Sequence, residues 1–238
     1  MRKTALITGG SSDLTSAISN VLSHHDINII LTYHNNYAKA YKLYDELKNK
    51  NNGVILVKCD VTKEEDILNL INTIKEKYSK LDYIINNAAL SLDNDIDNKT
   101  KEEFLKVLDT NLVGPFLIIK HGSKIMNEGV VINISSTDAF DTGSIYNIDY
   151  SASKSALNNL TYSLSKIYNN IKFVALAPNY IDTSSIREMD ENFLKEEMKR
   201  INQKKLLTKE EVAKKVYDLI VDSKIKSGSV IRMDDSNE

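Results

Sequence analysis

Seven short, almost uninterrupted apolar runs, separated by longer amphipathic segments, restrict most strongly how this chain can fold. The runs are Thr4–Thr8, Ile27–Tyr33, Val54–Lys58, Tyr83–Asn86, Val130–Ser135, Phe173–Ala177 and Val230–Met233. Continuous Val, Ile and Leu runs are typical of strands that are buried on both faces, as in a parallel sheet. The sequence therefore predicts a sheet that is covered by helices on either side.

The segments between the runs carry apolar residues at helical spacing. Three such stripes are Leu14, Ile18, Val21 and Leu22; Ile67, Leu70, Ile71 and Ile74; and Leu157, Leu160, Leu164 and Ile167. Alternating strands and helices favour right-handed crossovers and a doubly wound sheet. Because no linker rich in Gly, Pro or Ser interrupts the pattern, we predict a single three-layer α/β domain over residues 1–238.

Composition excludes several functional classes. The 31 Lys and Arg residues against 33 Asp and Glu residues give a net charge of −2, which argues against nucleic acid as a partner. The single cysteine, Cys59, excludes an internal disulfide framework and a Cys-rich zinc site. We predict no metal site. No apolar run reaches membrane-spanning length and no signal-peptide pattern precedes the first strand, so we expect a cytoplasmic protein without a membrane partner.

Helix starts and a lid can also be predicted. The tetrapeptide Thr-Lys-Glu-Glu occurs at Thr62–Glu65, Thr100–Glu103 and Thr208–Glu211, and each copy is interpreted as a capping box. The stretch from Asn179 to Leu207 is the least regular part of the chain. Ligands of open α/β sheets bind beyond the carboxyl ends of the strands, so residues 184–207 are a candidate substrate lid.

The first strand runs into a turn of small residues and then into a helix. This turn, Thr8-Gly9-Gly10-Ser11-Ser12-Asp13-Leu14-Thr15, has the composition that lets a backbone approach a pyrophosphate, and helix N–H groups would hold the anion. An ordinary tight turn between a strand and a helix explains the same residues equally well.

Further motifs follow in order along the chain. They are Cys59-Asp60-Val61, Asn86-Asn87-Ala88-Ala89, Asp109-Thr110-Asn111-Leu112, Ile134-Ser135-Ser136, Tyr150-Ser151-Ala152-Ser153-Lys154 and Ala177-Pro178-Asn179-Tyr180-Ile181-Asp182-Thr183. With the turn, the set resembles the short-chain dehydrogenase/reductase family over nearly the whole chain. Two segments, Leu206–Ala213 and Val230–Asp234, resemble those of 3-oxoacyl-[acyl-carrier-protein] reductases. The resemblance implies a Rossmann-type fold.

The resemblance also implies the roles of individual residues. Ser136, Tyr150, Lys154 and Asn111 would be catalytic. The cofactor would contact Gly9, Ser11, Ser12, Asp13, Leu14, His34, Asn35, Asp60, Val61, Asn87, Ala88, Tyr150, Lys154, Pro178, Ile181 and Thr183. In this pattern Tyr150 protonates the alkoxide, Ser136 holds the carbonyl oxygen and Asn111 anchors a water that links Lys154 to solvent.

The spacing of Tyr150 and Lys154 supports that chemistry independently. Residues four apart share one helix face, and an ammonium group beside a phenol, with an oxidised nicotinamide ring, is expected to lower the phenol's pKa. An ordinary helix surface would show the same pair. Either hydroxyl neighbour, Ser135 or Thr137, would take the role of Ser136 if the register shifted.

The chain departs from the family pattern at four glycine positions, which hold Asp13, Thr15, Ala89 and Asn179. A carboxylate beside a pyrophosphate is unfavourable unless it points away, and the structural role expected of Asp13 is to cap the first helix. Asn179 is the mildest change, because Asn tolerates left-handed backbone angles.

The end of the second strand favours NADP(H) over NAD(H). NAD selection uses a carboxylate at this end, but the sequence here is Thr32-Tyr33-His34-Asn35-Asn36, and Asp26 lies at the opposite end of the strand. Ser11, Ser12, His34 and Asn35 are candidate donors to a 2′-phosphate.

The resulting hypothesis is an NADP(H)-dependent oxidoreductase that interconverts a ketone and a secondary alcohol. Its substrate would be a small carbonyl or alcohol compound, and an acyl thioester on a carrier is one option. The alternative is a non-catalytic nucleotide-binding sensor or scaffold on the same fold. The resemblance also implies a homotetramer or homodimer formed through residues 101–121 and 151–168.

Overall fold

The computed structural model describes residues 2–51, 53–140 and 142–234 and places all seven predicted strands in one parallel sheet. The strand order is β3-β2-β1-β4-β5-β6-β7. The strands are β1 (Lys3–Ile7), β2 (Ile27–Tyr33), β3 (Val54–Lys58), β4 (Tyr83–Asn86), β5 (Gly129–Ile134), β6 (Ile171–Pro178) and β7 (Ser229–Met233). The predicted α/β fold class is confirmed, and the largest strand difference is β6, which begins two residues before the predicted run and ends one residue after it.

The order of the strands creates a switch point in the middle of the sheet. The chain runs outward from β1 to β2 and β3, returns to β4 on the other side of β1, and continues to β7. Connections after β1 and after β4 therefore leave the sheet toward opposite faces. A crevice opens between such connections beyond the carboxyl ends of the strands.

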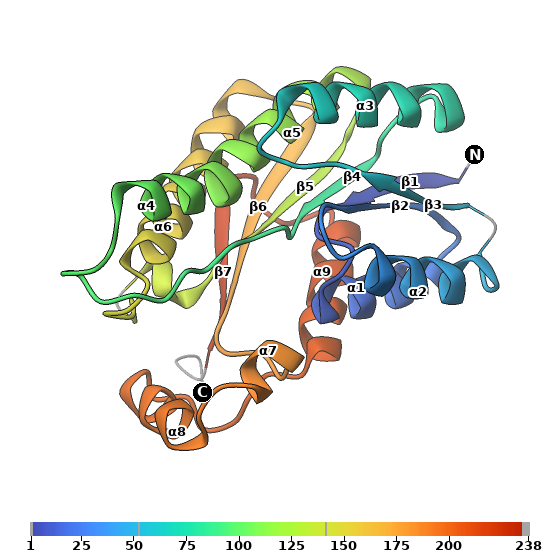
Figure 1. Ribbon diagram of the computed structural model, residues 1–238. Helices are drawn as coiled ribbons and strands as arrows, with labels where there is room; N and C mark the ends of the chain where they lie inside the picture. The colour runs from blue at the N-terminus through green and yellow to red at the C-terminus, as the bar shows by residue number, and fades with distance from the viewer. Residues whose placement is uncertain (1, 52, 141, 235–238) are drawn as a thin grey trace.

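Helices cover both faces of the sheet and give three layers (Figure 1). The helices are α1 (Asp13–Ser23), α2 (Tyr37–Lys48), α3 (Glu64–Tyr78), α4 (Lys101–Leu108), α5 (Gly114–Gly122), α6 (Ile148–Ile167), α7 (Ser184–Arg187), α8 (Glu191–Arg200) and α9 (Lys209–Val221). Helices α1, α2 and α9 lie on one face, and α3 to α6 lie on the other. Helices α7 and α8 stand beyond the carboxyl ends of the strands (Figure 1). Within the described residues, no helix is long and apolar enough to cross a membrane.

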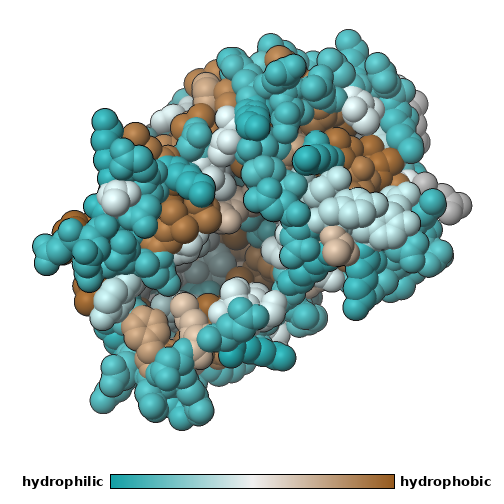
Figure 2. Space-filling view, in the orientation of Figure 1, coloured by the Kyte–Doolittle hydropathy of each residue, from teal (hydrophilic) through white to brown (hydrophobic). Residues whose placement is uncertain are grey.

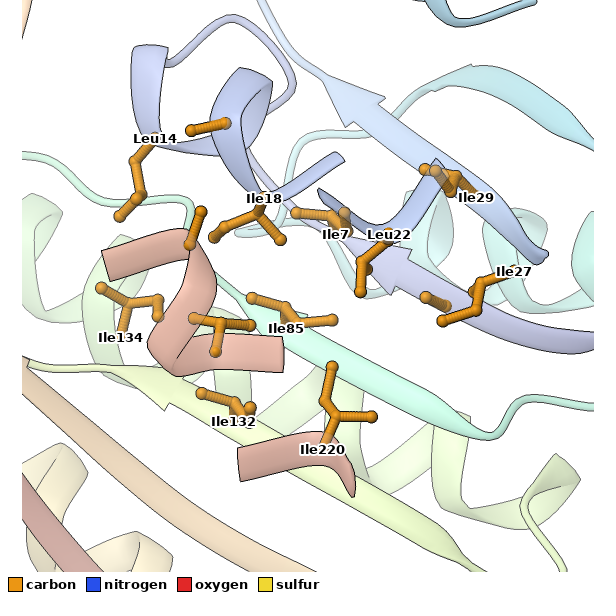
Figure 3. Packing of buried hydrophobic residues seen from close by; sticks show 14 of the residues in the cluster. Ile7, Leu14, Ile18, Leu22, Ile27, Ile29, Ile85, Ile132, Ile134 and Ile220 are labelled. Atoms are coloured by element: carbon orange, nitrogen blue, oxygen red, sulfur yellow. The ribbon is translucent and has the colours of Figure 1, made fainter. Parts of the chain in front are cut away.

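Two apolar cores hold the layers together. In the first, Ile18 and Leu22 of α1 lie against Ile7 and Ile85 of the sheet, with Ile220 of α9 on the same side (Figure 3). Full burial of one such side chain contributes roughly 1.5–3 kcal/mol. The predicted stripes form the inner faces of their helices, except for Ile167, which ends α6 with 68% of its surface exposed.

Two of the three predicted capping boxes are present. Thr100 and Thr208 each accept a hydrogen bond from the glutamate N–H three residues later, and each glutamate reaches back to the cap. The prediction was wrong at Thr62, because the Asp60 carboxylate accepts bonds from both the N–H and the hydroxyl of Thr62. Helix α3 consequently begins after Lys63 without a side-chain cap.

The candidate lid is tied to the body by its return segment. Gln203 donates to the carbonyl of Tyr180 at 2.8 Å and accepts from its N–H at 3.1 Å, and Ile181 forms a β-bridge with Leu207. Arg200 at the end of α8 donates to the carbonyl oxygens of Thr142 and Gly143. The lid segment thus lies against the wall that follows Ser136.

Candidate active site

A cavity of about 1260 Å³ lies at the carboxyl ends of the strands. Figure 2 shows this face hollowed between the body and the segment that carries α7 and α8. Every residue predicted to bind the cofactor lines this cavity, as do the predicted catalytic residues Ser136, Tyr150 and Lys154. The exception is Asn111, which lies behind the cavity wall and is 1% exposed.

The turn after β1 is shaped for close approach by a ligand. Gly9 has φ +80°, and a Cβ there would lie 3.1 Å from the Cα of Ala88. A Cβ on Gly10 would lie 2.8 Å from the carbonyl oxygen of Thr32. Only glycine fits this cradle, and it opens onto the N-terminus of α1, where backbone N–H groups favour an anion. These features fit the pyrophosphate of a dinucleotide.

Hydroxyl groups brace the turn where the family pattern has glycine. Ser12 is the N-cap of α1, since its Oγ accepts from the N–H of Thr15 at 3.0 Å. The hydroxyl of Thr15 donates to the carbonyl of Gly9 at 2.8 Å and accepts from Nδ2 of Asn87 at 2.9 Å. Thr8 Oγ1 in turn accepts from the N–H groups of Asn87 and Ala88. Thr15 therefore ties the turn to the end of β4.

The Asp13 carboxylate points away from the turn, and the prediction that it caps α1 was wrong because Ser12 is the N-cap. Its carboxylate accepts from both the N–H and the hydroxyl of Ser184 at 2.6 Å and lies 2.9 Å from Nζ of Lys39. These hydrogen bonds, followed by the Lys39 charge, lower the pKa of Asp13 far below its usual range. We call this group the Asp13 latch, since it joins the turn to the start of the lid.

The second-strand end of the cavity contains His34, Asn35, Asp60 and Val61. Nε2 of His34 lies 3.4 Å from Oδ2 of Asp60. Lys39 also lines the cavity. The residues at the strand end did not predict Lys39, because this lysine lies in the first turn of α2, which returns it to the cavity.

Ser136, Tyr150 and Lys154 meet at the opposite end of the cavity. Nζ of Lys154 lies 5.3 Å from the centre of the Tyr150 ring and donates to the carbonyl of Ile134 at 2.7 Å. Hydrogen bonding between Ser136 and the Tyr150 phenol acts to lower the pKa of that phenol. The contacts of Tyr150 with Lys154 and with Ser136 bring the three side chains together around one part of the cavity.

Neighbouring hydroxyl groups are engaged elsewhere. Ser135 Oγ lies 3.4 Å from the backbone carbonyl oxygen of Lys154, and Thr137 donates to Oδ1 of Asn179. These contacts favour Ser136 as the hydroxyl that faces Tyr150. Asn179 has no left-handed backbone angle, so its role lies in its side chain.

Burial sets the protonation of Tyr150 and Lys154. It raises the pKa of the Tyr150 phenol, and the Asp138 carboxylate raises it further. The expected lowering of this pKa is therefore not found in the protein alone. Burial also lowers the pKa of Lys154 to about 8, although Asp138 opposes the shift. At neutral pH Tyr150 is protonated, which is the form that gives a proton to a ketone.

Asn111 lies in a π-helical turn, Asp109–Val113, between α4 and α5. Its side chain accepts from the N–H of Leu90 at 2.7 Å and donates to the carbonyl of Leu90 and to Oγ of Ser153. The extra residue of the π turn aims the amide toward α6. Asn111 thus joins the loop after β4 to the helix that carries Tyr150 and Lys154.

Two other sequence expectations concern thiols and metals. Cys59 is 2% exposed, and burial raises the pKa of its thiol to about 12, so it is a packed and unreactive group. Among the described residues, no group of three His, Cys, Asp or Glu side chains is arranged to hold a metal ion. Asp138 also lines the cavity, and no motif in the sequence predicted this.

Comparison with known proteins identifies the family. The family model described as short chain dehydrogenase matches residues 3–193. Glucose 1-dehydrogenase 2 of Bacillus subtilis is 30% identical over 219 residues, covering 89% of this chain and 84% of that protein. The 3-oxoacyl-[acyl-carrier-protein] reductase of Staphylococcus aureus is 28% identical over 206 residues, covering 83% and 82%.

Solved structures agree on the fold. A dehydrogenase/reductase from Sinorhizobium meliloti superimposes with a TM-score of 0.91 at 25% identity, covering 98% of this chain and 93% of that one. A short-chain dehydrogenase from Burkholderia cenocepacia, solved in complex with NADP, gives a TM-score of 0.91 at 21% identity and covers 98% and 96%. The chain belongs to the short-chain dehydrogenase/reductase family of oxidoreductases, which act on CH–OH and C=O groups with a nicotinamide dinucleotide.

Proposed function

We propose that this protein interconverts a ketone and a secondary alcohol with NADP(H), and that Tyr150 transfers the proton. The observation that carries the proposal is one cavity with the glycine cradle at one end and Ser136, Tyr150 and Lys154 at the other. The dinucleotide would supply or accept the hydride. Its pyrophosphate would lie on the turn that includes Gly9, Ser11, Ser12 and Leu14, and its nicotinamide half would lie near Pro178, Ile181 and Thr183.

The residues of the chain then have distinct tasks. Ser136 holds the carbonyl oxygen, and protonated Tyr150 gives its proton to that oxygen as negative charge develops. Lys154 stands beside the phenol and would hold the nicotinamide ribose. Asn111 orders the loop after β4 against α6, which keeps Tyr150 and Lys154 in register with the cavity.

The experiment measures how fast NADPH absorbance falls with a panel of ketones, and it compares the wild type with Tyr150→Phe. We expect Tyr150→Phe to lower kcat by about 10²–10⁴-fold, the usual contribution of a general acid. Tyr146→Phe is the matched control, since Tyr146 lies just before α6 and its ring packs on that of Phe193, with 5.8 Å between the ring centres. Equal rates for Tyr150→Phe and the wild type would reject the proposal.

NADP(H) is the proposed cofactor because the second-strand end offers donors and a cation. His34, Asn35 and Lys39 line this part of the cavity, and the Burkholderia relative was solved with NADP. Calorimetry should give a lower Kd for NADPH than for NADH. Lys39→Met should reduce this preference, and equal affinities in the wild type would contradict it.

The relatives suggest two substrate classes. One is named for the oxidation of glucose and the other for the reduction of a 3-oxoacyl thioester. The cavity wall includes the apolar lid residues Ile186 and Met189 together with polar Asn147 and Tyr180. Oxidation of glucose with NADP⁺ and reduction of a 3-oxoacyl thioester with NADPH, measured side by side, will separate the two classes.

A cytoplasmic location stays a prediction.

We also propose that the protein forms a homodimer or homotetramer in which the contact is made by the face of α4, α5 and α6. Large apolar side chains on this face are exposed, namely Leu105, Val113, Phe116, Tyr162 and Ile167. Covering them would remove apolar surface from water. Light scattering should report more than one chain per particle, and Phe116→Glu should shift the particle toward a monomer.

A further inference from the structure

Asp138 lies in the catalytic cavity, but the proton route described above does not use it. It lies two residues after Ser136, in a short 3₁₀ turn that Ser136 caps: the N–H of Asp138 donates to Oγ of Ser136 at 3.1 Å. Asp138 lines the same cavity as Tyr150 and Tyr180. Its position follows directly from that of the serine proposed to hold the substrate oxygen.

The Asp138 carboxylate is half-buried, and a hydrogen bond with the side chain of Ser136 acts to lower its pKa. Within the described parts of the chain, no cation lies at ion-pair distance from it. Arg200 acts on it from a distance, but the Arg200 guanidinium pairs with Glu197 at 2.8 Å and donates to the carbonyl of Thr142. The Lys154 ammonium is held by the carbonyl of Ile134. Neither cation neutralises the carboxylate directly.

Burial raises the pKa of Asp138 to about 6. The group is therefore mostly ionised at neutral pH, at a cost in stability. Its charge reaches both catalytic side chains, since it raises the pKa of Tyr150 and opposes the fall in the pKa of Lys154. A substrate that occupies the space around Ser136 and Tyr150 meets an acceptor that lacks a cationic partner.

The groups next to the reacting carbon decide which substrates the Asp138 carboxylate favours. A simple ketone, or the carbonyl groups of an acyl thioester, presents lone pairs and would be repelled by the carboxylate. A hydroxyl group next to the reacting carbon presents an O–H donor, and hydrogen bonds to charged groups are the stronger ones. Asn147, Tyr180 and Ser91 on the same cavity wall are polar and neutral, which also suits hydroxyl groups.

We infer that Asp138 accepts a hydrogen bond from a substrate hydroxyl adjacent to the reacting carbon, so that the enzyme prefers vicinal diols and α-hydroxy ketones. The inference rests on the proposed function. Reduction of the α-hydroxy ketone would transfer a hydride from the reduced dinucleotide to the carbonyl carbon and the phenol proton of Tyr150 to the carbonyl oxygen, which leaves a vicinal diol; oxidation of the diol is the reverse of this step. Asp138 exchanges no proton in this step and acts as a specificity-determining residue.

The test compares cyclohexane-1,2-diol with cyclohexanol as substrates, with NADP⁺ as the oxidant. These two compounds differ by the adjacent hydroxyl alone. For the wild type we expect kcat/KM to be about tenfold or more higher for the diol. Asp138→Asn should lower this ratio about tenfold, and so should Asp138→Ser, which keeps a small polar group in the turn. Glu188→Gln is the matched control, since Glu188 is an exposed carboxylate on the same cavity, and it should leave the ratio unchanged.

The outcomes separate the two proposals. A wild-type preference for cyclohexanol, or a ratio that both Asp138 variants leave intact, overturns the assignment of Asp138 while loss of turnover in Tyr150→Phe upholds the proposed function. Undiminished turnover in Tyr150→Phe overturns the proposed function itself. Calorimetry with NADPH and thermal unfolding establish that each variant is folded and binds cofactor, so that a changed ratio reports on the substrate.

Discussion

The two ends of the cavity are held in place by different physical means. At the phosphate-turn end, Ser12, Thr15 and Asn87 form a network of neutral hydrogen bonds, and the Asp13 latch lies near the surface. At the catalytic end, charges are buried: Lys154 is 3% exposed, and the ion pair of Lys99 and Asp149 has 3% and 0% of its side-chain surface exposed. The contrast shows where the sequence was free to change. In the proposed function, backbone N–H groups bind the pyrophosphate at the turn, so side chains can stand at positions 13 and 15 while Gly9 and Gly10 keep the cradle open. At the other end, the side chains themselves would carry the chemistry.

The buried pair at the catalytic end should give the largest effect on stability. Lys99 Nζ lies 3.1 Å from Asp149, whose other oxygen accepts from the N–H of Tyr150. Lys99→Met leaves a buried carboxylate unpaired, and we expect a loss of about 3–5 kcal/mol in the free energy of unfolding. Urea unfolding measures it. Lys214→Met breaks an exposed pair with Asp218 and should cost under about 1 kcal/mol. Similar losses in the two variants would remove the contrast between the ends.

Thr15 tests whether hydroxyl bracing has replaced glycine at the turn. Thr15→Gly restores the residue of the family pattern but removes the bonds to Gly9 and Asn87 from a fully buried site. We expect a loss of about 2 kcal/mol in the free energy of unfolding. Thr73→Gly, at an outer position of α3, is the control for helix propensity and should cost less than about 1 kcal/mol. An unchanged or higher stability in Thr15→Gly would show that the hydroxyl merely fills space.

Local patterns were enough to predict most of the frame of the site. The apolar runs gave the strands, and the four-residue spacing of Tyr150 and Lys154 placed both on one helix face. What the patterns missed depends on contacts between distant segments. Asp13 meets Ser184, 171 residues away, because the lid returns across the cavity, and no local pattern predicts that path. Thr62 had the sequence of a cap, but a carboxylate two residues earlier competed for it.

Asp138 offers a pH test of the catalytic end. Its folded pKa, about 6, lies above the ordinary value of 3.8, so the folded state binds more protons than the unfolded state between these values. Its contribution to stability therefore falls as pH rises from about 4 to about 6. Asp138→Asn removes this cost, and we expect it to be more stable than the wild type by about 1–2 kcal/mol at pH 7. The difference should vanish near pH 4 in thermal unfolding, and a gain independent of pH would contradict the argument.

The smallest expected effect concerns the Asp13 latch, where charge and geometry oppose each other. The hydrogen bonds and cation that lower the pKa of Asp13 keep it ionised at neutral pH, close to where the proposed pyrophosphate would lie. Asp13→Asn removes this charge and releases Lys39 toward a 2′-phosphate, so the Kd for NADPH should fall about threefold to tenfold, with a smaller change for NADH. The gain should shrink in high salt because the residues are near the surface. Asp13→Asn is expected to improve the affinity for NADPH more than that for NADH. Adding Lys39→Met to Asp13→Asn should reverse this difference between the two gains. Weaker NADPH binding in Asp13→Asn would instead mean that joining the turn to the lid outweighs the repulsion, and that the turn end also depends on a fixed ion pair.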